Sequence, residues 1–247
     1  MHRFFIDKKN ICKDNIHIEG DDVQHISRVL RLKEGDKIML CDQQGTDYYV
    51  SITELSKHSV KTAVISKEPS KGEPSMEVVL YQGVPKSTKM DLIIQKCTEM
   101  GITRVVPVMT ARTVVKLESQ KDEEKKTARW TKIAEEAAKQ SARGIVPRIN
   151  MPMSFEQALM DSKDLDMVLI PYELEKDMSV KKALQGKVPK SIGFFIGPEG
   201  GFDDNEIEKA KQNNIVPVTL GSRIMRTETA GFAILTCLMY EYDQMQR

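Results

Sequence analysis

Two loops near the C-terminal end of the chain combine residue types that bind ligands. The first, GPEGG at residues 197–201, contains three glycines, whose missing Cβ lets a ligand approach the main chain. The second, LGSRIMRTETA at residues 220–230, follows a short apolar run and precedes an apolar helix. Loops at the carboxyl ends of parallel strands are where α/β folds bind their ligands. The two loops are therefore predicted to form a binding site.

The first loop does not suit a phosphate group. The chain has neither GxGxxG nor GxxxxGK(S/T), and Glu199, Asp203 and Asp204 would repel an anion. An alternative is that the glycines only make a tight turn between a strand and a helix. The residues alone leave the ligand loop and the tight turn both open.

The second loop carries more charge than a turn needs. Arg223, Arg226 and Glu228 stand between two apolar segments. In the alternative interpretation, Thr227 caps the following helix and Glu228 interacts favourably with the helix dipole. That alternative explains Thr227 and Glu228 but neither arginine, so the pattern favours a ligand site.

The elements that must position these loops follow an α/β pattern. Residues 1–72 show short β-rich runs separated by turn signals, which predicts a small β-barrel with one helix capped by Asp21 or Asp22. EPSKGEP at residues 68–74 is typical of an interdomain linker. From Met76 onward, apolar strand runs alternate with amphipathic helices. This alternation predicts a parallel sheet covered by helices on both faces.

Capping signals predict where two of these helices begin. Thr88 with Asp91 has the spacing of a capping box, and Gly101 can end the same helix in the left-handed conformation. Asp203 with Glu206 has the same spacing directly after the first loop. Apolar side chains are expected on the buried stripe of the first helix and as a hydrophobic staple on the second. They are Met90, Ile93, Ile94 and Cys97, and Phe202 with Ile207, respectively.

Composition excludes several classes of protein. The chain has 37 lysines and arginines against 36 acidic residues, so any nucleic-acid site must be a local patch. The four cysteines lack metal-ligand spacing, and no metal is expected to be required. No run is long enough to span a membrane, and the N-terminus lacks a signal core, which predicts a cytoplasmic protein.

The chain resembles the SPOUT methyltransferase superfamily and, within it, the family that methylates N3 of a uridine in bacterial 16S ribosomal RNA. Beyond the two loops, the resemblance is carried by motifs along the whole chain. These are HISRVLRLKEGD at residues 25–36, KSTKMDLIIQKCTEMG at 86–101, AAKQSARGIVPRI at 137–149 and LIPYE at 169–173.

The resemblance implies a PUA-like β-barrel RNA-binding domain at residues 1–72 and an α/β trefoil-knot methyltransferase domain at residues 73–247. It also implies S-adenosyl-L-methionine as the methyl donor, a homodimer with the active site near the subunit interface, and ribosomal RNA or the small ribosomal subunit as partner. The implied donor-binding residues come from three loops, with main-chain groups of Gly197, Leu220 and Met225 in direct contact. The full set is Leu169, Pro171, Ile196, Gly197, Gly201, Leu220, Gly221, Met225 and Arg226.

Methylation of N3 requires removal of a proton from the uracil ring, because this nitrogen is protonated in uridine. Glu228 is a candidate proton acceptor, and Arg226 could stabilise the negative charge that develops on the uracil oxygens. RNA phosphates are expected to contact basic residues, although each of these residues is as readily a solvated surface charge. The candidates are Arg3, Arg28, Arg31, Lys86, Lys89, Arg112, Arg143 and Arg148.

Other functions remain open from the sequence. A non-catalytic RNA-binding or ribosome-assembly protein could keep the same two domains but would need neither the glycine loop nor Arg226. A SPOUT methyltransferase with a different RNA target would keep both. A nucleotide hydrolase would require a phosphate loop or a cluster of metal-binding carboxylates, which the sequence lacks.

Overall fold

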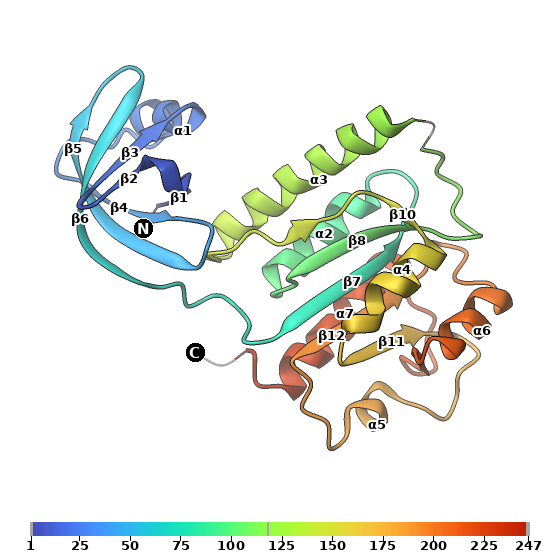
Figure 1. Cartoon of the computed structure of the whole chain (residues 1–247). Helices are drawn as coiled ribbons and strands as arrows, with labels where there is room; N and C mark the ends of the chain where they lie inside the picture. Colours follow the sequence, from blue (N-terminus) through green and yellow to red (C-terminus); the bar gives the residue numbers. More distant parts are fainter. Residues whose placement is uncertain (1, 118, 246–247) are drawn as a thin grey trace. The chain divides into compact units, whose positions relative to one another are not determined.

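The computed structural model describes residues 2–117 and 119–245, which form two compact units (Figure 1). Unit 1 contains Met1–Glu73 together with Ala138–Val146. Unit 2 contains Pro74–Ala137 and Pro147–Arg247. Unit 1 is therefore discontinuous in sequence, and the end of helix α3 (Gln120–Gln140) belongs to it.

Unit 1 is built on a six-stranded curled sheet in the order β1-β4-β5-β6-β3-β2. All neighbouring pairs are antiparallel except β1 and β4. Alternate side chains such as Ile16 and Ile18, or Ile38 and Leu40, fill one apolar cluster, as expected for a sheet with one buried face. The strands are β1 (Arg3–Phe5), β2 (Ile11–Cys12), β3 (Asn15–Glu19), β4 (Lys37–Cys41), β5 (Thr46–Leu55) and β6 (Ser59–Pro69).

The short helix of unit 1 does not begin as predicted. Helix α1 (Asp21–Gln24) has Gly20 at its N-cap, and no side chain caps it. Gly20 has φ of +77°, a conformation that favours glycine, so the chain enters the helix from this residue. The cap assigned to Asp21 or Asp22 is wrong, because both aspartates lie inside the first turn. A π-helical turn (His25–Val29) continues the helix.

Unit 2 contains the predicted parallel sheet. Its strands run in the order β10-β8-β7-β12-β11-β13, with β9 paired to β8, and every pairing is parallel. The α/β fold class is therefore confirmed. The strands are β7 (Glu77–Gly83), β8 (Arg104–Met109), β9 (Arg148–Ile149), β10 (Met153–Ser154), β11 (Met167–Pro171), β12 (Ser191–Ile196) and β13 (Val216–Val218).

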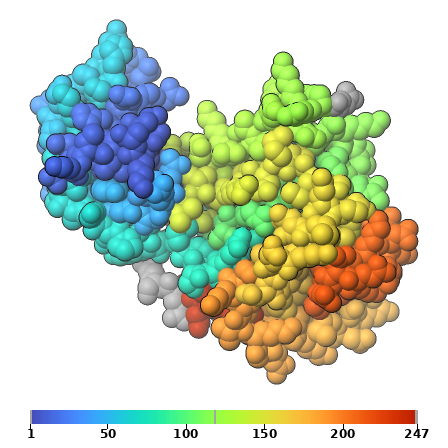
Figure 2. All heavy atoms as spheres, in the orientation of Figure 1, coloured from blue at the N-terminus to red at the C-terminus, as the bar shows by residue number. Residues whose placement is uncertain are grey.

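Helices cover both faces of this sheet. Val79 and Tyr81 of β7 belong to an apolar cluster with side chains of α4 (Phe155–Asp161) and α6 (Asp204–Gln212). Figure 1 shows α4 and α6 in front of the sheet, and their segments, yellow and orange-red, form part of the visible surface in Figure 2. The intervening Leu80 and Gln82 face Gly231 of α7 (Thr227–Glu241). Helix α7 packs against α2 (Lys89–Glu99), and α5 (Val180–Leu184) lies beside β13.

Helix α2 begins and ends where predicted but is capped differently. All four residues of its predicted stripe are buried, and Gly101 has φ of +96° after the last turn, which confirms both expectations. Thr88 occupies the N-cap without a side-chain cap bond. The carboxylate of Asp91 instead pairs with the guanidinium of Arg129 on α3, so the predicted capping box is wrong. A charge-assisted pair is the stronger contact of the two.

The capping box on α6 is confirmed. Asp203 accepts a hydrogen bond from the main-chain N–H of Glu206 at 2.8 Å, and Glu206 accepts one from the N–H of Asp203 at 3.1 Å. Phe202 and Ile207 are both buried in the same cluster. Helix α4 was not predicted, although Ser154 and Gln157 form an equivalent capping box that the sequence already contained.

Candidate functional site

A cavity of about 820 Å³ opens at the carboxyl ends of β11, β12 and β13, and it is lined by both C-terminal loops, which follow β12 and β13. Leu169 does not line this cavity; its side chain is fully buried within β11, between β12 and β13. The other predicted donor-binding residues do line it. They are Pro171, Ile196, Gly197, Gly201, Leu220, Gly221, Met225 and Arg226.

The first loop depends on its glycines. Gly201 has φ of +68°, and its N–H donates to the carbonyl of Pro198 at 2.9 Å. A Cβ on Gly197 would lie 2.9 Å from the Cα of Gly201, and a Cβ on Gly83 would lie 2.6 Å from the Cδ of Pro198. Side chains at these positions would therefore force the loop and β7 apart.

Basic residues from neighbouring segments hold the outside of the same loop. The guanidinium of Arg112 donates to the carbonyl of Gly200 at 2.7 Å. The main-chain N–H of Lys86 donates to the carboxylate of Glu199 at 3.1 Å and 3.3 Å. Three of the predicted RNA contacts, at Lys86, Lys89 and Arg112, thus lie next to the first loop.

Lys89, Glu199 and Glu228 form a charge cluster beside the cavity, here called the lysine cluster. The Nζ of Lys89 lies 3.0 Å from Glu199 and 3.6 Å from Glu228. Hydrogen bonding to Glu199 raises the pKa of Lys89. Burial works to raise the pKa of Glu199, but its hydrogen bonds, first of all with Lys89, outweigh burial and hold it below the ordinary value.

Glu228 is the least satisfied member of the lysine cluster. Its side chain is 16% exposed, and its Oε2 is buried without a hydrogen bond within the described part of the chain. Its contact with Lys89 is an ion pair at a distance too long for a hydrogen bond. This oxygen can accept a proton or a new hydrogen bond without breaking an existing one.

The second loop turns its arginines outward and its threonine inward. Arg223 and Arg226 are exposed, and Ile224 between them is 96% exposed. The alternative interpretation, in which Thr227 caps α7, is not what the structure shows, because Arg226 occupies the N-cap and Thr227 is the first residue of the helix. The hydroxyl of Thr227 is instead buried and donates to the carbonyl of Gly197 at 2.6 Å.

Basic residues predicted to hold RNA in unit 1 divide into two groups. Arg28 and Arg31 are exposed, and Arg31 has φ of +53°, which is uncommon for a non-glycine residue. Arg3 and Arg143 are turned inward instead, with side chains only 11% and 2% exposed. Arg148, in unit 2, is exposed.

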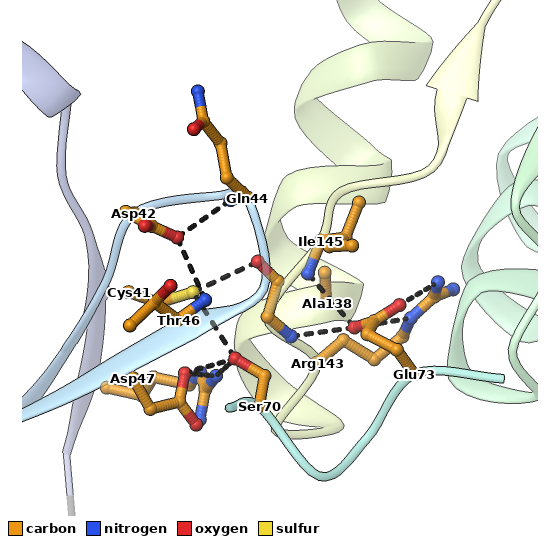
Figure 3. A network of polar contacts seen from close by, with 12 residues as sticks. Cys41, Asp42, Gln44, Thr46, Asp47, Ser70, Glu73, Ala138, Arg143 and Ile145 are labelled. Carbon is orange, nitrogen blue, oxygen red and sulfur yellow. Dashed lines mark hydrogen bonds and ion pairs between the residues drawn. The ribbon is translucent and has the colours of Figure 1, made fainter. Parts of the chain in front are cut away.

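Figure 3 shows the polar network of unit 1, with Arg143 pointing toward Glu73. Arg143 donates to Glu73 at 2.7 Å, and the same carboxylate accepts the main-chain N–H groups of Gly144 and Ile145 at 2.7 Å and 2.9 Å. Arg3 pairs with Asp47. Neither guanidinium is presented to a ligand in this structure, which argues against the RNA contacts predicted for Arg3 and Arg143.

Two residues at the site were missed or misread by the sequence reasoning. Gln82, at the end of β7, is completely buried under the first loop. Its signal was a polar residue in an otherwise apolar strand run, EVVLYQGV, which a strand buried on both faces does not need. For Glu199 the sequence indicates only a charge that repels phosphate, because its partner Lys89 lies far away in the sequence.

Two further properties of the described chain bear on the site. No helix within residues 2–117 and 119–245 is long and apolar enough to cross a membrane. Over the same ranges, no group of three histidine, cysteine, aspartate or glutamate side chains lies close enough together to hold a metal ion.

Comparison with known proteins identifies the families that this arrangement resembles. The RNA methyltransferase domain family matches residues 72–239, and the RNA methyltransferase PUA domain family matches residues 18–65. A Bacillus subtilis protein named Ribosomal RNA small subunit methyltransferase E is 37% identical, over 100% of this chain and 99% of its own length. A protein of the same name from Mesomycoplasma hyopneumoniae is 32% identical, over 96% of this chain and 98% of its own.

A solved structure is also similar over nearly the whole chain. The crystal structure of a Ribosomal RNA small subunit methyltransferase E from Neisseria gonorrhoeae, bound to S-adenosyl methionine, matches with a TM-score of 0.86. It is 27% identical and the match covers 98% of each chain.

Proposed function

Because this chain belongs to the RNA methyltransferase family of Ribosomal RNA small subunit methyltransferase E, we propose that it methylates 16S ribosomal RNA at N3 of a uridine, with S-adenosyl-L-methionine as donor. The observation that carries the proposal is the cavity at which GPEGG and LGSRIMRTETA meet. Both loops follow carboxyl ends of parallel strands, where this class of fold binds ligands.

The residues around the cavity fit this donor. Its volume of about 820 Å³ lies within the range of cofactor sites. Its lining includes the carboxylates of Glu173 and Glu175 as well as the arginines of the second loop, and the donor itself carries charges of both signs. When bound, the donor supplies an electrophilic methyl group on a sulfonium. Main-chain groups of Gly197, Leu220 and Met225 are proposed to hold it.

The chain's own side chains would then prepare the uracil base. Methyl transfer needs the nucleophilic nitrogen in line with the methyl group, so most of the work is positioning and the exclusion of water. The base must leave its stack to reach a cavity of this kind. Glu228 would take the N3 proton on its unbonded Oε2, and Arg226 would stabilise the charge on the uracil oxygens.

RNA would be held by both units. The PUA-like residues 1–72 offer Arg28 and Arg31, and residues 73–247 offer Lys86, Lys89 and Arg112 around the first loop. The ribosomal substrate in turn suggests the cytoplasm as the place of action. The trefoil knot stays a prediction of the family resemblance.

A second copy of the chain is proposed to cover helix α7. This helix is apolar around its circumference, yet Phe232 and Tyr240 are 39% and 76% exposed. Leu92 on α2, which packs beside α7, is 45% exposed. A homodimer would bury this apolar face. Since α7 begins at the cavity, the active site would then lie near the subunit interface.

The proposal is tested by comparing modified nucleosides in 16S ribosomal RNA from cells with and without this protein. Loss of N3-methyluridine, restored by the purified protein and S-adenosylmethionine, is the expected result. An unchanged nucleoside profile would contradict the proposed reaction. Calorimetric titration with S-adenosylmethionine separates the enzyme from a non-catalytic RNA-binding protein, which should show no heat of donor binding.

A further inference from the structure

The two loops of the cavity are joined by hydrogen bonds beneath its floor. The amide nitrogen of Gln82 donates to the hydroxyl of Thr227 at 2.9 Å, and that hydroxyl donates to the carbonyl of Gly197 at 2.6 Å. The same amide nitrogen lies 3.0 Å from the carbonyl of Gly83 and 3.5 Å from that of Gly197. Gln82 is 0% exposed and Thr227 is 6% exposed.

This joint connects three separate segments of unit 2. Gln82 is on β7, Gly197 begins the first loop directly after β12, and Thr227 is the first residue of α7 directly after the second loop. The hydrogen bonds therefore set the distance between the point where the first loop starts and the point where the second loop ends. Both loops line the cavity between these points.

The joint leaves one buried polar atom without a partner. The Oε1 of Gln82 is buried and has no hydrogen bond in the described structure, and an unsatisfied buried acceptor destabilises the folded state. Val78, Val79 and Leu80 of the same strand are apolar and buried, so the amide of Gln82 is an exception within the buried part of β7. A polar residue retained at such a cost indicates a role beyond stability.

We propose that Gln82 and Thr227 are positioning residues that hold the two loops in the register required to bind the methyl donor. The proposal rests on the proposed function, since it concerns the same cavity. The side chains act through Gly197 and through the start of α7, whose first turn carries Glu228. Disturbing the joint should weaken donor binding even when the fold is retained.

Thr227→Val is the first test, because valine keeps the shape of threonine but can neither donate nor accept a hydrogen bond. The dissociation constant for S-adenosylmethionine, measured by calorimetry on the full chain, should rise about tenfold. Thr227→Ser retains the hydroxyl and should restore binding close to that of the wild type. Failure of serine to restore binding, or wild-type binding by the valine variant, would overturn the proposal.

Thr62→Val is the matched control. Thr62 is a buried threonine of unit 1 that donates a hydrogen bond to the carbonyl of Ile16 at 3.0 Å, whereas the residues that line the cavity belong to unit 2. Its replacement should lower the urea midpoint of unfolding without changing the affinity for S-adenosylmethionine. Equal losses of donor affinity in Thr62→Val and Thr227→Val would mean that the effect is only one of general stability, and the proposal would fail.

Gln82→Met separates positioning from stability in a second way. The substitution removes the unbonded Oε1 but also the amide that donates to Thr227 and Gly83, so the unfolding midpoint should fall by no more than in Thr62→Val, while the dissociation constant for S-adenosylmethionine should still increase. Unchanged affinity in this variant would contradict the role of Gln82. If the wild-type protein itself bound no donor, the proposed function would fail instead, so the two failures are distinguishable.

Discussion

Two clusters of charge in this molecule use the same kinds of residue in opposite ways. In unit 1, Glu73 receives Arg143 and two main-chain N–H groups, so both of its oxygens are satisfied, and Arg143 is 2% exposed. In the lysine cluster of unit 2, Lys89 forms ion pairs with two carboxylates. Among the described residues, a buried oxygen of Glu228 has no hydrogen-bond partner.

The difference separates charged groups that only stabilise the fold from charged groups that can still bind a ligand or take part in a reaction. A fully satisfied buried pair has no capacity for a ligand, and breaking it leaves a buried charge without compensation. A partly satisfied group at the edge of a cavity costs stability but can take part in chemistry. Substitutions in the unit 1 pair should therefore change stability, and substitutions at the cavity should change activity.

The largest effect is expected for Arg226→Ala. If this arginine stabilises charge on the uracil oxygens, the methylation rate at saturating S-adenosylmethionine should fall about a thousandfold. Losses of this size are found when one hydrogen-bond donor that stabilises a transition-state charge is removed. The unfolding midpoint should not change, since the side chain is exposed. Arg223→Ala, at an exposed arginine in the same loop, should lose clearly less activity. Wild-type methylation by Arg226→Ala would remove this residue from the mechanism.

Glu73→Ala should give the largest change in stability. Removing this carboxylate leaves Arg143 buried without its partner, and the free energy of unfolding should drop by about 3 kcal/mol. Glu54→Ala provides the control, because Glu54 pairs with Lys61 at an exposed position of the same unit and should contribute less than about 1 kcal/mol. Urea denaturation measures both. A similar loss of unfolding free energy in the two variants would contradict the distinction between charged groups that stabilise the fold and those that can bind a ligand.

Glu228→Gln should reduce the methylation rate about 100-fold, because the amide cannot accept the N3 proton. The substitution should not lower the unfolding midpoint, since it removes a carboxylate whose buried oxygen is unsatisfied. Glu99→Gln is the control: Glu99 pairs with Lys96 on α2, and its loss should leave the rate unchanged. Equal rates for Glu228→Gln and the wild type would show that another group removes the proton.

The smallest effect is expected from pH. The pKa of Glu199 is held below its ordinary value of 4.5, so its ion pair with Lys89 is fully present above that value. The contribution should disappear only as the pH falls through the lowered pKa. Through Glu199, the affinity for S-adenosylmethionine measured by calorimetry should thus not vary with pH near neutrality. In acid, protonation of Glu199 should lower the affinity of the wild type for S-adenosylmethionine. Glu199→Gln has no carboxylate at this position and should not show this loss, so identical acid profiles would contradict the role of Glu199.

Local signals predicted those parts of the fold in which the interacting residues are close in sequence. The box of Asp203 and Glu206 formed as expected, because the main-chain N–H of Ala111 binds the other carboxylate oxygen of Glu206 and does not displace the capping contact. The box of Thr88 and Asp91 failed because Asp91 found Arg129 on another helix. The alternative in which Thr227 caps α7 is excluded by a similar long-range contact, since its hydroxyl donates to the carbonyl of Gly197.

The candidate site was predicted as two loops but not as a set of contacts. Glycine content and charge indicated both loops, since these are properties of short sequences. The pairing of Lys89 with Glu199, the joint at Gln82 and the inward turn of Arg143 all depend on residues distant in sequence. Periodicity cannot identify which distant partner a polar side chain will choose, so these features required the structure.

The discontinuity of unit 1 also has a consequence for synthesis on the ribosome. The carboxylate of Glu73 accepts hydrogen bonds from Arg143, Gly144 and Ile145. These residues are synthesised only after β7, α2 and β8 have been translated. The first 73 residues are therefore synthesised before these hydrogen bonds can form. The barrel is complete only when the later segment Ala138–Val146 has been added. A chain terminated before residue 146 would therefore contain an incomplete barrel. If the barrel were transferred alone to another protein, a different segment would have to replace residues 138–146.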